Sequence, residues 1–318
     1  MITTHTAEIP ELDQRVGPIW RAALSREEVQ RLLEPRDWRS WCSIAVNWGL
    51  VAASFALVAV WPNPLTIVVA LVVIGARQLS CAAIMHDAAH RCLFRDRRLN
   101  DWAGSWLAAY PVWSDLHLYR PYHLKHHAKT GRPDDPDIGL VRPFPITRAS
   151  LRRKIWRDLS GQTGRKFARA AWKRTFARAH DDPAARRAAI GVAVTNLVLL
   201  GLLAAAGHPA LYLLWVGAWL TTYTLVTRVR SIAEHALTPD AEDPLGNTRT
   251  VLARWWERLL IAPNRLGFHL EHHLLMTVPH YNLPKLHQML RDRGVLDGAC
   301  VERSYPAILR RAASAPAA

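Results

Sequence analysis

Two long blocks of the sequence contain no charged residue. Lys, Arg, Asp and Glu are absent from Trp41 to Ala76 and from Ala188 to Thr227. Each block is about twice the ~20 apolar residues with which a helix crosses ~30 Å of hydrocarbon. Pro62-Asn63-Pro64 divides the first block and Gly207-His208-Pro209 the second, and such residues end one helix and permit a reversal. The sequence therefore predicts two helical hairpins, with membrane spans at about residues 40–62, 64–85, 188–206 and 209–227.

The positive charges are confined to the segments outside these hairpins. All 41 Lys and Arg residues lie before residue 40, between 77 and 187, or after 227. Because Lys and Arg mark the cytoplasmic side of membrane proteins, both termini and the middle loop are expected there. The same bias, together with attraction to anionic headgroups, accounts for the net charge of +15 without nucleic acid. The alternative is recognition of an acidic group such as a phosphorylated acyl carrier.

The remaining segments predict short helices at the membrane surface. Ser25-Arg26-Glu27-Glu28 forms a capping-box pattern, and Pro35 closes the helix, which is expected to lie along the membrane. Residues 101–116 are apolar and Trp-rich but are broken by Pro111, which indicates an interfacial or re-entrant piece. Residues 148–187 mix Arg and Lys with Trp and Leu, as amphipathic helices on headgroups do. We expect three parts: a cytoplasmic amphipathic segment (1–39), one membrane domain (40–305) and a flexible tail (306–318).

The cysteines and the N-terminus exclude two other classes of protein. The four cysteines form no CxxC pair, so neither a disulfide framework nor an iron–sulfur cluster is expected. The N-terminus is polar and its first apolar run begins near residue 40, so no cleavable signal peptide is expected. The cysteines are Cys42, Cys81, Cys92 and Cys300.

Eight of the fifteen histidines fall in three short windows. The windows are HDAAH at 86–90, HLKHH at 123–127 and HLEHH at 269–273. Residues at i, i+3 and i+4 are neighbours on one helical face, so HxxxH offers two imidazoles to one point and HxxHH offers three. Because each hairpin returns to the side from which it starts, all three windows are expected on one side of the membrane, where they can converge.

This histidine set predicts a pair of metal ions. Imidazole suits zinc, copper, iron and nickel, but eight donors exceed the needs of one tetrahedral zinc. Iron is preferred because a redox metal explains the many ligands and leaves positions open for oxygen. His235, where the fourth span ends, is a ninth candidate. The candidate metal ligands are His86, His90, His123, His126, His127, His235, His269, His272 and His273.

Several polar residues adjoin these candidates. Carboxylates beside a ligand can orient its ring by accepting the second N–H, although solvation is the alternative. The remaining histidines near the windows, His117, His280 and His287, are expected to form hydrogen bonds or to lie on the surface. The candidates for orienting the imidazoles are Asp87, Glu234, Asn264 and Glu271.

The order of the three windows resembles the membrane fatty-acid desaturase superfamily. The third window continues as HHLLMTVPHYNLPKLH, and the resemblance covers roughly residues 35–290. It implies an all-α integral membrane protein of four transmembrane helices in two hairpins, with a cytoplasmic helical cap that carries the histidine boxes. It also implies a di-iron centre (Fe2+/Fe3+) held by the eight window histidines and His235, with O2 as co-substrate. Because no fused haem-binding or ferredoxin-like domain is recognised, electrons are expected from a separate donor such as ferredoxin.

The leading hypothesis is an O2-dependent desaturase of a long-chain acyl lipid in the bacterial inner membrane. Glu234 beside His235 resembles the alkane-hydroxylase branch, so a hydroxylase or ketolase of a fatty acid, alkane or carotenoid is the alternative. A zinc hydrolase is disfavoured because the sequence contains no HExxH and the first window has Asp87 instead. A transporter is disfavoured because both charge-free blocks lack ionisable residues at mid-membrane.

Overall fold

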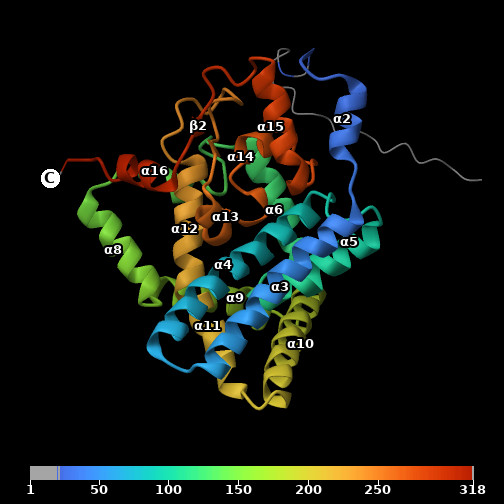
Figure 1. Ribbon diagram of the computed structural model, residues 1–318, viewed down its shortest axis with the longest axis vertical. Helices are drawn as coiled ribbons and strands as arrows, with labels where there is room; N and C mark the ends of the chain where they lie inside the picture. The colour runs from blue at the N-terminus through green and yellow to red at the C-terminus, as the bar shows by residue number, and fades with distance from the viewer. Residues whose placement is uncertain (1–19, 21, 317–318) are drawn as a thin grey trace, which may run out of the picture.

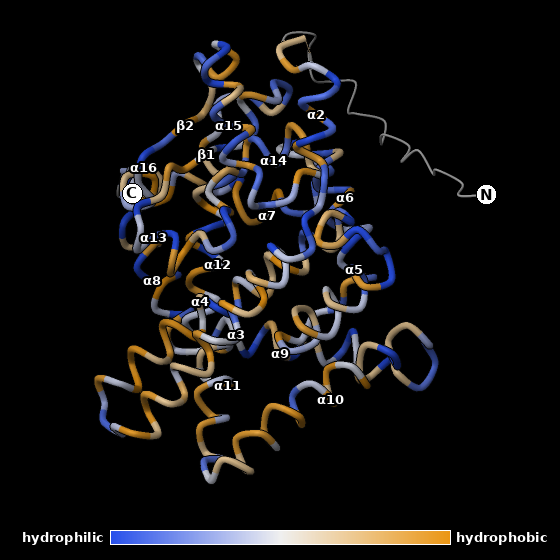
Figure 2. The backbone as a smooth tube through the Cα atoms, turned by 45° about the vertical axis from the view of Figure 1, so that its right-hand side comes forward, coloured by the Kyte–Doolittle hydropathy of each residue, from blue (hydrophilic) through white to orange (hydrophobic). Residues whose placement is uncertain are grey.

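The computed structural model describes residue 20 and residues 22–316. Figure 1 shows a bundle of long helices in its lower half and a cap of shorter helices above them. Apolar residues dominate the lower helices, and hydrophilic residues are frequent in the cap (Figure 2). Residues 1–19 and 21 of the predicted N-terminal segment lie outside the described residues.

Four helical segments are long and apolar enough to cross a membrane, as judged by length and composition. Each predicted span is present, and each extends further at the end opposite its hairpin turn, because helical hydrogen bonding continues past the apolar window into the cap. The segments are α3 (Asp37–Val60), α4 (Pro64–Ala89), α10 (Pro183–Ala205) and Pro209–His235, the last built from η3 (Pro209–Leu211), α11 (Tyr212–Leu220) and α12 (Thr222–His235).

The two hairpin turns have the predicted local causes. The Asn63 side chain caps α4 by accepting hydrogen bonds from the amides of Leu65 (3.0 Å) and Thr66 (3.1 Å), and Pro64 occupies the first turn. Gly207, at φ +82°, follows the end of α10 in the left-handed conformation that glycine adopts freely. These residues end one span and begin the next within a few positions.

The fourth segment is interrupted at Thr221. Its φ of −123° and ψ of −83° separate α11 from α12, and its hydroxyl donates to the carbonyl of Gly217 (2.6 Å). The neighbouring Thr222 hydroxyl donates to the carbonyl of Leu71 on α4 (2.6 Å). A side chain on Gly75 of α4 would overlap Thr222. The break therefore lies at a close approach of the second and fourth spans.

We expect Gly75→Val to destabilise the protein by forcing α4 away from α12. Overpacking of this kind costs ~1–3 kcal/mol, and thermal unfolding in detergent measures it. Gly49→Val on α3 is the matched control, because nothing lies within 4 Å of a side chain built at Gly49. Equal melting temperatures for the two variants would contradict the close approach.

The remaining elements are short and belong mostly to the cap. β1 and β2 form a two-stranded parallel sheet that pairs Thr250 with Val301 and Val251 with Glu302. The elements are α2 (Arg26–Leu33), α5 (Arg97–Gly104), η1 (Ser105–Ala109), η2 (Tyr110–Val112), α6 (Leu116–Lys129), α7 (Ile138–Val141), α8 (Arg148–Leu159), α9 (Gln162–Thr175), β1 (Thr250–Val251), α13 (Trp255–Leu260), η4 (Pro263–Arg265), α14 (His269–Leu274), η5 (His280–Asn282), α15 (Leu283–Asp292), β2 (Val301–Glu302) and α16 (Tyr305–Ala312).

Two expectations about the ends of the chain need correction. The capping box at Ser25 is present, but α2 packs on the cap: Leu32 is buried in a cluster with Leu286, and Glu28 pairs with Arg293 (2.6 Å). The predicted tail from residue 306 is helical through Ala312 in α16, because Tyr305, Ile308 and Ala312 are buried. All four cysteines are free, as predicted.

Candidate metal centre

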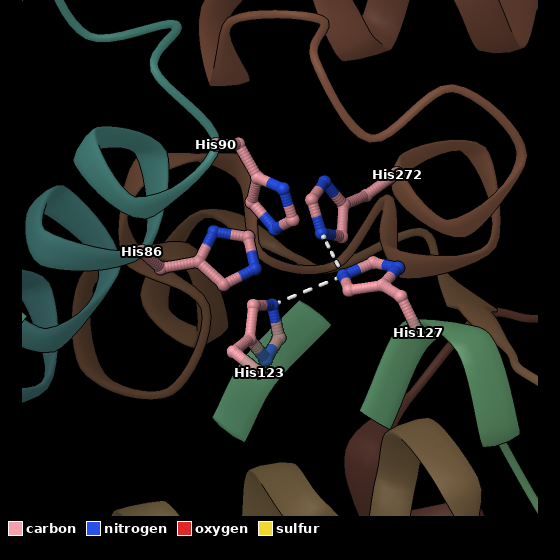
Figure 3. A group of neighbouring side chains, drawn as sticks. All are labelled: His86, His90, His123, His127 and His272. Carbon is pink, nitrogen blue, oxygen red and sulfur yellow. Dashed lines mark hydrogen bonds between the residues drawn. The ribbon is translucent and has the colours of Figure 1, made fainter. Parts of the chain in front are cut away.

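All nine predicted histidines gather in two neighbouring groups, in each of which one ring nitrogen from every histidine lies within 4.8 Å of the others. They come from four elements that are distant in sequence: α4, α6, α12 and α14. Figure 3 shows the five-histidine group with its rings turned toward a common centre. The five-histidine group is His86, His90, His123, His127 and His272; the four-histidine group is His126, His235, His269 and His273.

The first window is the last turn of α4 and its C-cap. His86 lies in the helix and His90 is the C-cap residue, so the two rings lie one turn apart and meet edge to face, with centroids 4.8 Å apart. α4 reaches this point because it continues beyond the apolar window. The second membrane span thus delivers two imidazoles directly to the cap.

Each HxxHH window divides its histidines between the two groups, whereas the sequence predicted three imidazoles at one point. On a helix of 3.6 residues per turn, i and i+4 differ by ~40° in direction, but i+3 and i+4 differ by ~100°. His123 and His127 therefore point to one group while His126 points to the other. In the third window, His269 and His273 share a group and His272 joins the opposite one.

The ring nitrogens face one another within each group. In the five-histidine group, His127 Nε2 lies 3.0 Å from Nε2 of both His123 and His272. In the four-histidine group, His269 Nε2 lies 2.8 Å from His235 Nε2 and 3.1 Å from His273 Nε2. Such facing nitrogens leave space for one electron-pair acceptor per group.

The protonation of these histidines also suits metal binding. Both ring nitrogens of His86 and of His90 are buried without a hydrogen-bond partner, which is costly unless another group satisfies them. Burial lowers the pKa of six of the rings well below the ordinary value, so these imidazoles are neutral and free to donate electron pairs. The six are His90, His123, His127, His269, His272 and His273. The donor set fits two metal ions.

Asp135 holds one ring of the four-histidine group in position. His126 Nδ1 donates to it at 2.8 Å, and it also accepts from the amides of Gly131 (2.9 Å) and Asp137 (2.8 Å). Burial alone would raise the pKa of Asp135, but the hydrogen bond from His126, together with those from the two amides, lowers it. The carboxylate fixes Nδ1 of His126 as the donor and leaves Nε2 for the group.

Two of the predicted carboxylates contact histidines outside the nine. Asp87 accepts from His280 Nδ1 (2.6 Å) and lies 3.5 Å from His86 Nδ1. Glu271, which is fully buried, accepts from His287 Nδ1 (2.6 Å) and from the Thr250 hydroxyl (2.5 Å). Each acid therefore links a histidine window to a neighbouring element of the cap by hydrogen bonds.

The other two predicted residues differ in their distance from the site. Glu234 accepts from Arg230 Nε (2.6 Å), and its second oxygen lies 3.5 Å from His269 Nε2. Asn264 accepts from Ser80 on α4 (3.1 Å) and, among the described residues, forms a hydrogen bond with none of the nine histidines. Its role as an orienting residue has no support in this geometry.

Comparison with known proteins decides the family. The family model described as fatty acid desaturase matches residues 62–301. The chain belongs to this family. Dihydrorhizobitoxine desaturase of Bradyrhizobium elkanii is 30% identical over 293 residues, which are 85% of this chain and 81% of that protein. The sn-1 oleoyl-lipid 12-desaturase of Synechocystis is 24% identical and covers 90% of this chain and 88% of its own length. The sn-1 acyl-lipid omega-3 desaturase (ferredoxin) of Synechocystis is 26% identical over 39% of this chain and 33% of its own length.

In this member of the desaturase family, sequence reasoning missed Asp135 and the partners of the buried acids. Asp134-Asp135-Pro136-Asp137 follows the second window within ten residues and was the available signal. His280 and His287 were expected to form hydrogen bonds or to lie on the surface, and both are buried and bonded to carboxylates. His117 is exposed, as the surface alternative predicted.

Proposed function

We propose that each histidine group holds one iron ion and that the protein is an O2-dependent desaturase. The two adjacent sets of facing imidazoles are the observation that supports this most directly. A bound iron pair supplies the oxidising power that removal of hydrogen from an unactivated methylene requires. The ligand set is the one predicted from the sequence, with five donors in one group and four in the other.

The chain's own residues orient the rings and exclude water. Seven of the nine histidines are buried and the other two, His235 and His273, are half-buried. Asp135 holds the tautomer of His126, and Asp87 lies beside His86. A dry, preoriented donor set keeps its geometry when the substrate approaches and limits side reactions with solvent.

We infer that the substrate is a long-chain acyl lipid and that the electron donor is a separate protein such as ferredoxin. Two of the relatives are named for lipid substrates and one of these names ferredoxin, whereas the Bradyrhizobium relative is named for dihydrorhizobitoxine. Desaturation removes two hydrogens from the substrate while O2 takes up two further electrons and two protons to give two waters. The donor supplies these two electrons.

We further propose a multi-pass membrane protein with both termini and the histidine groups on the cytoplasmic side of the bacterial inner membrane. The four apolar segments support membrane insertion, and the Lys and Arg distribution supports the orientation. On this side the groups are accessible to a soluble electron donor, while the substrate chain reaches them from the bilayer.

Expression with a compatible electron donor tests the reaction. The expected product is lighter than its substrate by two hydrogens, and mass spectrometry of host lipids detects it. A product heavier by one oxygen would replace the desaturase by a hydroxylase or ketolase on the same scaffold. Elemental analysis of iron-supplied protein should give two irons per chain, and two zincs instead would argue for a hydrolytic or transport role.

A further inference from the structure

α8 and α9 form a strongly basic pair of helices that the proposed chemistry does not use. Each carries five Lys or Arg residues, and the pair contains a single carboxylate, Asp158. Asp158 is fully buried and accepts two hydrogen bonds from Arg228 on α12, at 2.5 and 2.8 Å. No carboxylate of either helix therefore compensates the positive charge on their exposed face.

Part of this positive charge lies around a hollow between the start of α8 and the end of α16. These two segments adjoin at the left of Figure 1. Its volume of about 880 Å³ is within the range of small-ligand sites. Its described lining includes no acidic residue. The lining residues are Thr147, Arg148, Ala149, Arg152, Arg153, Arg310, Ala313, Ser314 and Ala315.

The arginine side chains that line this hollow lack hydrogen-bond acceptors in the described part of the chain. Within residues 22–316, none of the four lining arginines forms an ion pair, although Arg311 next to Arg310 pairs with Glu302. The hollow also receives the N-terminus of α8, where Thr147 caps the amide of Ser150 (3.1 Å). The amides of Arg148 and Ala149 have no acceptor in the described part of the chain. Free amides at a helix start, together with arginines, favour an anion.

The two walls of the hollow are fixed to each other. The Ile146 amide donates to the Ala312 carbonyl (2.8 Å), and the Ala315 amide donates to the Ile146 carbonyl (3.2 Å). Beneath them, Leu151 and Leu309 share an apolar cluster with α12. The backbone that carries the arginines is thus held in place without a ligand.

We propose that this hollow binds the phosphate of an anionic phospholipid. Trp156 follows Arg152 by one turn and is 67% exposed, beside Arg157, and exposed tryptophans among cations are typical of a membrane interface. α9 packs against α10 and α11, which places the basic pair beside the membrane spans. A free phosphate could use the same arginines, but it would leave the exposed aromatic side chains unexplained.

Lipid titration of the full-length protein in a nonionic detergent tests this. Native mass spectrometry counts bound phosphatidylglycerol, phosphatidylcholine or inorganic phosphate on the wild type and on the Arg148→Gln/Arg152→Gln/Arg153→Gln/Arg310→Gln variant. A basic residue beside an anionic lipid surface contributes ~1 kcal/mol, or about fivefold in affinity. The variant should therefore lose phosphatidylglycerol binding by on the order of 100-fold or more, with phosphatidylcholine binding unchanged.

The matched control removes the same number of charges elsewhere on the surface. Arg97→Gln/Arg98→Gln/Arg291→Gln/Arg303→Gln should keep wild-type binding, because these exposed side chains lie outside the hollow. If the quadruple variant does not fold, Arg152→Gln/Arg153→Gln alone should weaken binding by about 25-fold.

Three results would overturn the assignment. One is equal phosphatidylglycerol binding by the variant and its control. Another is inorganic phosphate binding as tightly as the lipid, which would make this a site for free phosphate. The third is a variant that no longer binds an acidic acyl-carrier protein but still binds the lipid, which would make the hollow a protein docking site. Phosphate binding in the hollow does not depend on which metal the histidine groups bind.

Discussion

His272→Ala should abolish desaturation and lower the iron content of the purified protein. His272 Nε2 lies 3.0 Å from His127 Nε2 in the five-histidine group, so its removal takes a donor from the centre of that group. Loss of an outer hydrogen-bond partner already costs ~10- to 100-fold in metal affinity or activity, and loss of a direct donor should cost more. His90→Ala should behave in the same way.

Product formation in cells and elemental analysis of the purified variant measure both effects. His117→Ala is the control, since His117 lies on α6 with three of the grouped histidines but is exposed to solvent. Membrane insertion should be unaffected in all three variants because the four spans are unchanged. Near-normal turnover and iron content in His272→Ala or His90→Ala would show that the ligand assignment is wrong.

Asp135→Asn should reduce metal retention and turnover by about 10- to 100-fold while the protein stays folded. The carboxylate accepts the Nδ1 proton of His126 and two backbone amide protons. An asparagine side chain keeps the shape but loses the charge and places an NH2 group where an acceptor is needed. The His126 ring then loses the bond that fixes its tautomer and orientation.

Titration with a chelator, followed by metal analysis, measures this loss directly. Asp134→Asn is the matched control, because the neighbouring Asp134 side chain is half exposed and its one ion pair among the described residues is with Lys129 (3.1 Å). The control should retain wild-type iron. If the two variants released iron at the same chelator concentration, Asp135 would have no orienting role.

The membrane hairpins and the set of grouped histidines could be predicted because their signals are local. A charge-free run between proline and glycine turns defines a span whatever its neighbours are, and HxxxH or HxxHH spacing places imidazoles on one side of a helix. The start of α2 was likewise visible in its capping box at Ser25. In each case the cause lies within one continuous segment of the chain.

The features that were missed depend on contacts between distant parts of the chain. Asp87 and His280 are 193 residues apart, and nothing local distinguishes this pair from a solvated acid and a surface histidine. The helix α16 forms because Tyr305 and Ile308 are buried in an apolar cluster of the folded protein. Composition alone does not show this burial. The division of each HxxHH window between the two groups could be recognised only from the positions of the histidines on α4 and α12.

That division affects how the site responds to its bilayer. His126 and His127 are consecutive residues, and so are His272 and His273, with one member of each pair in each group. Membranes of different thickness change the tilt of spanning helices, but the offset between neighbouring residues on α6 or α14 is set by covalent geometry. The separation of the two groups should therefore remain constant when the enzyme works in thinner or thicker lipid.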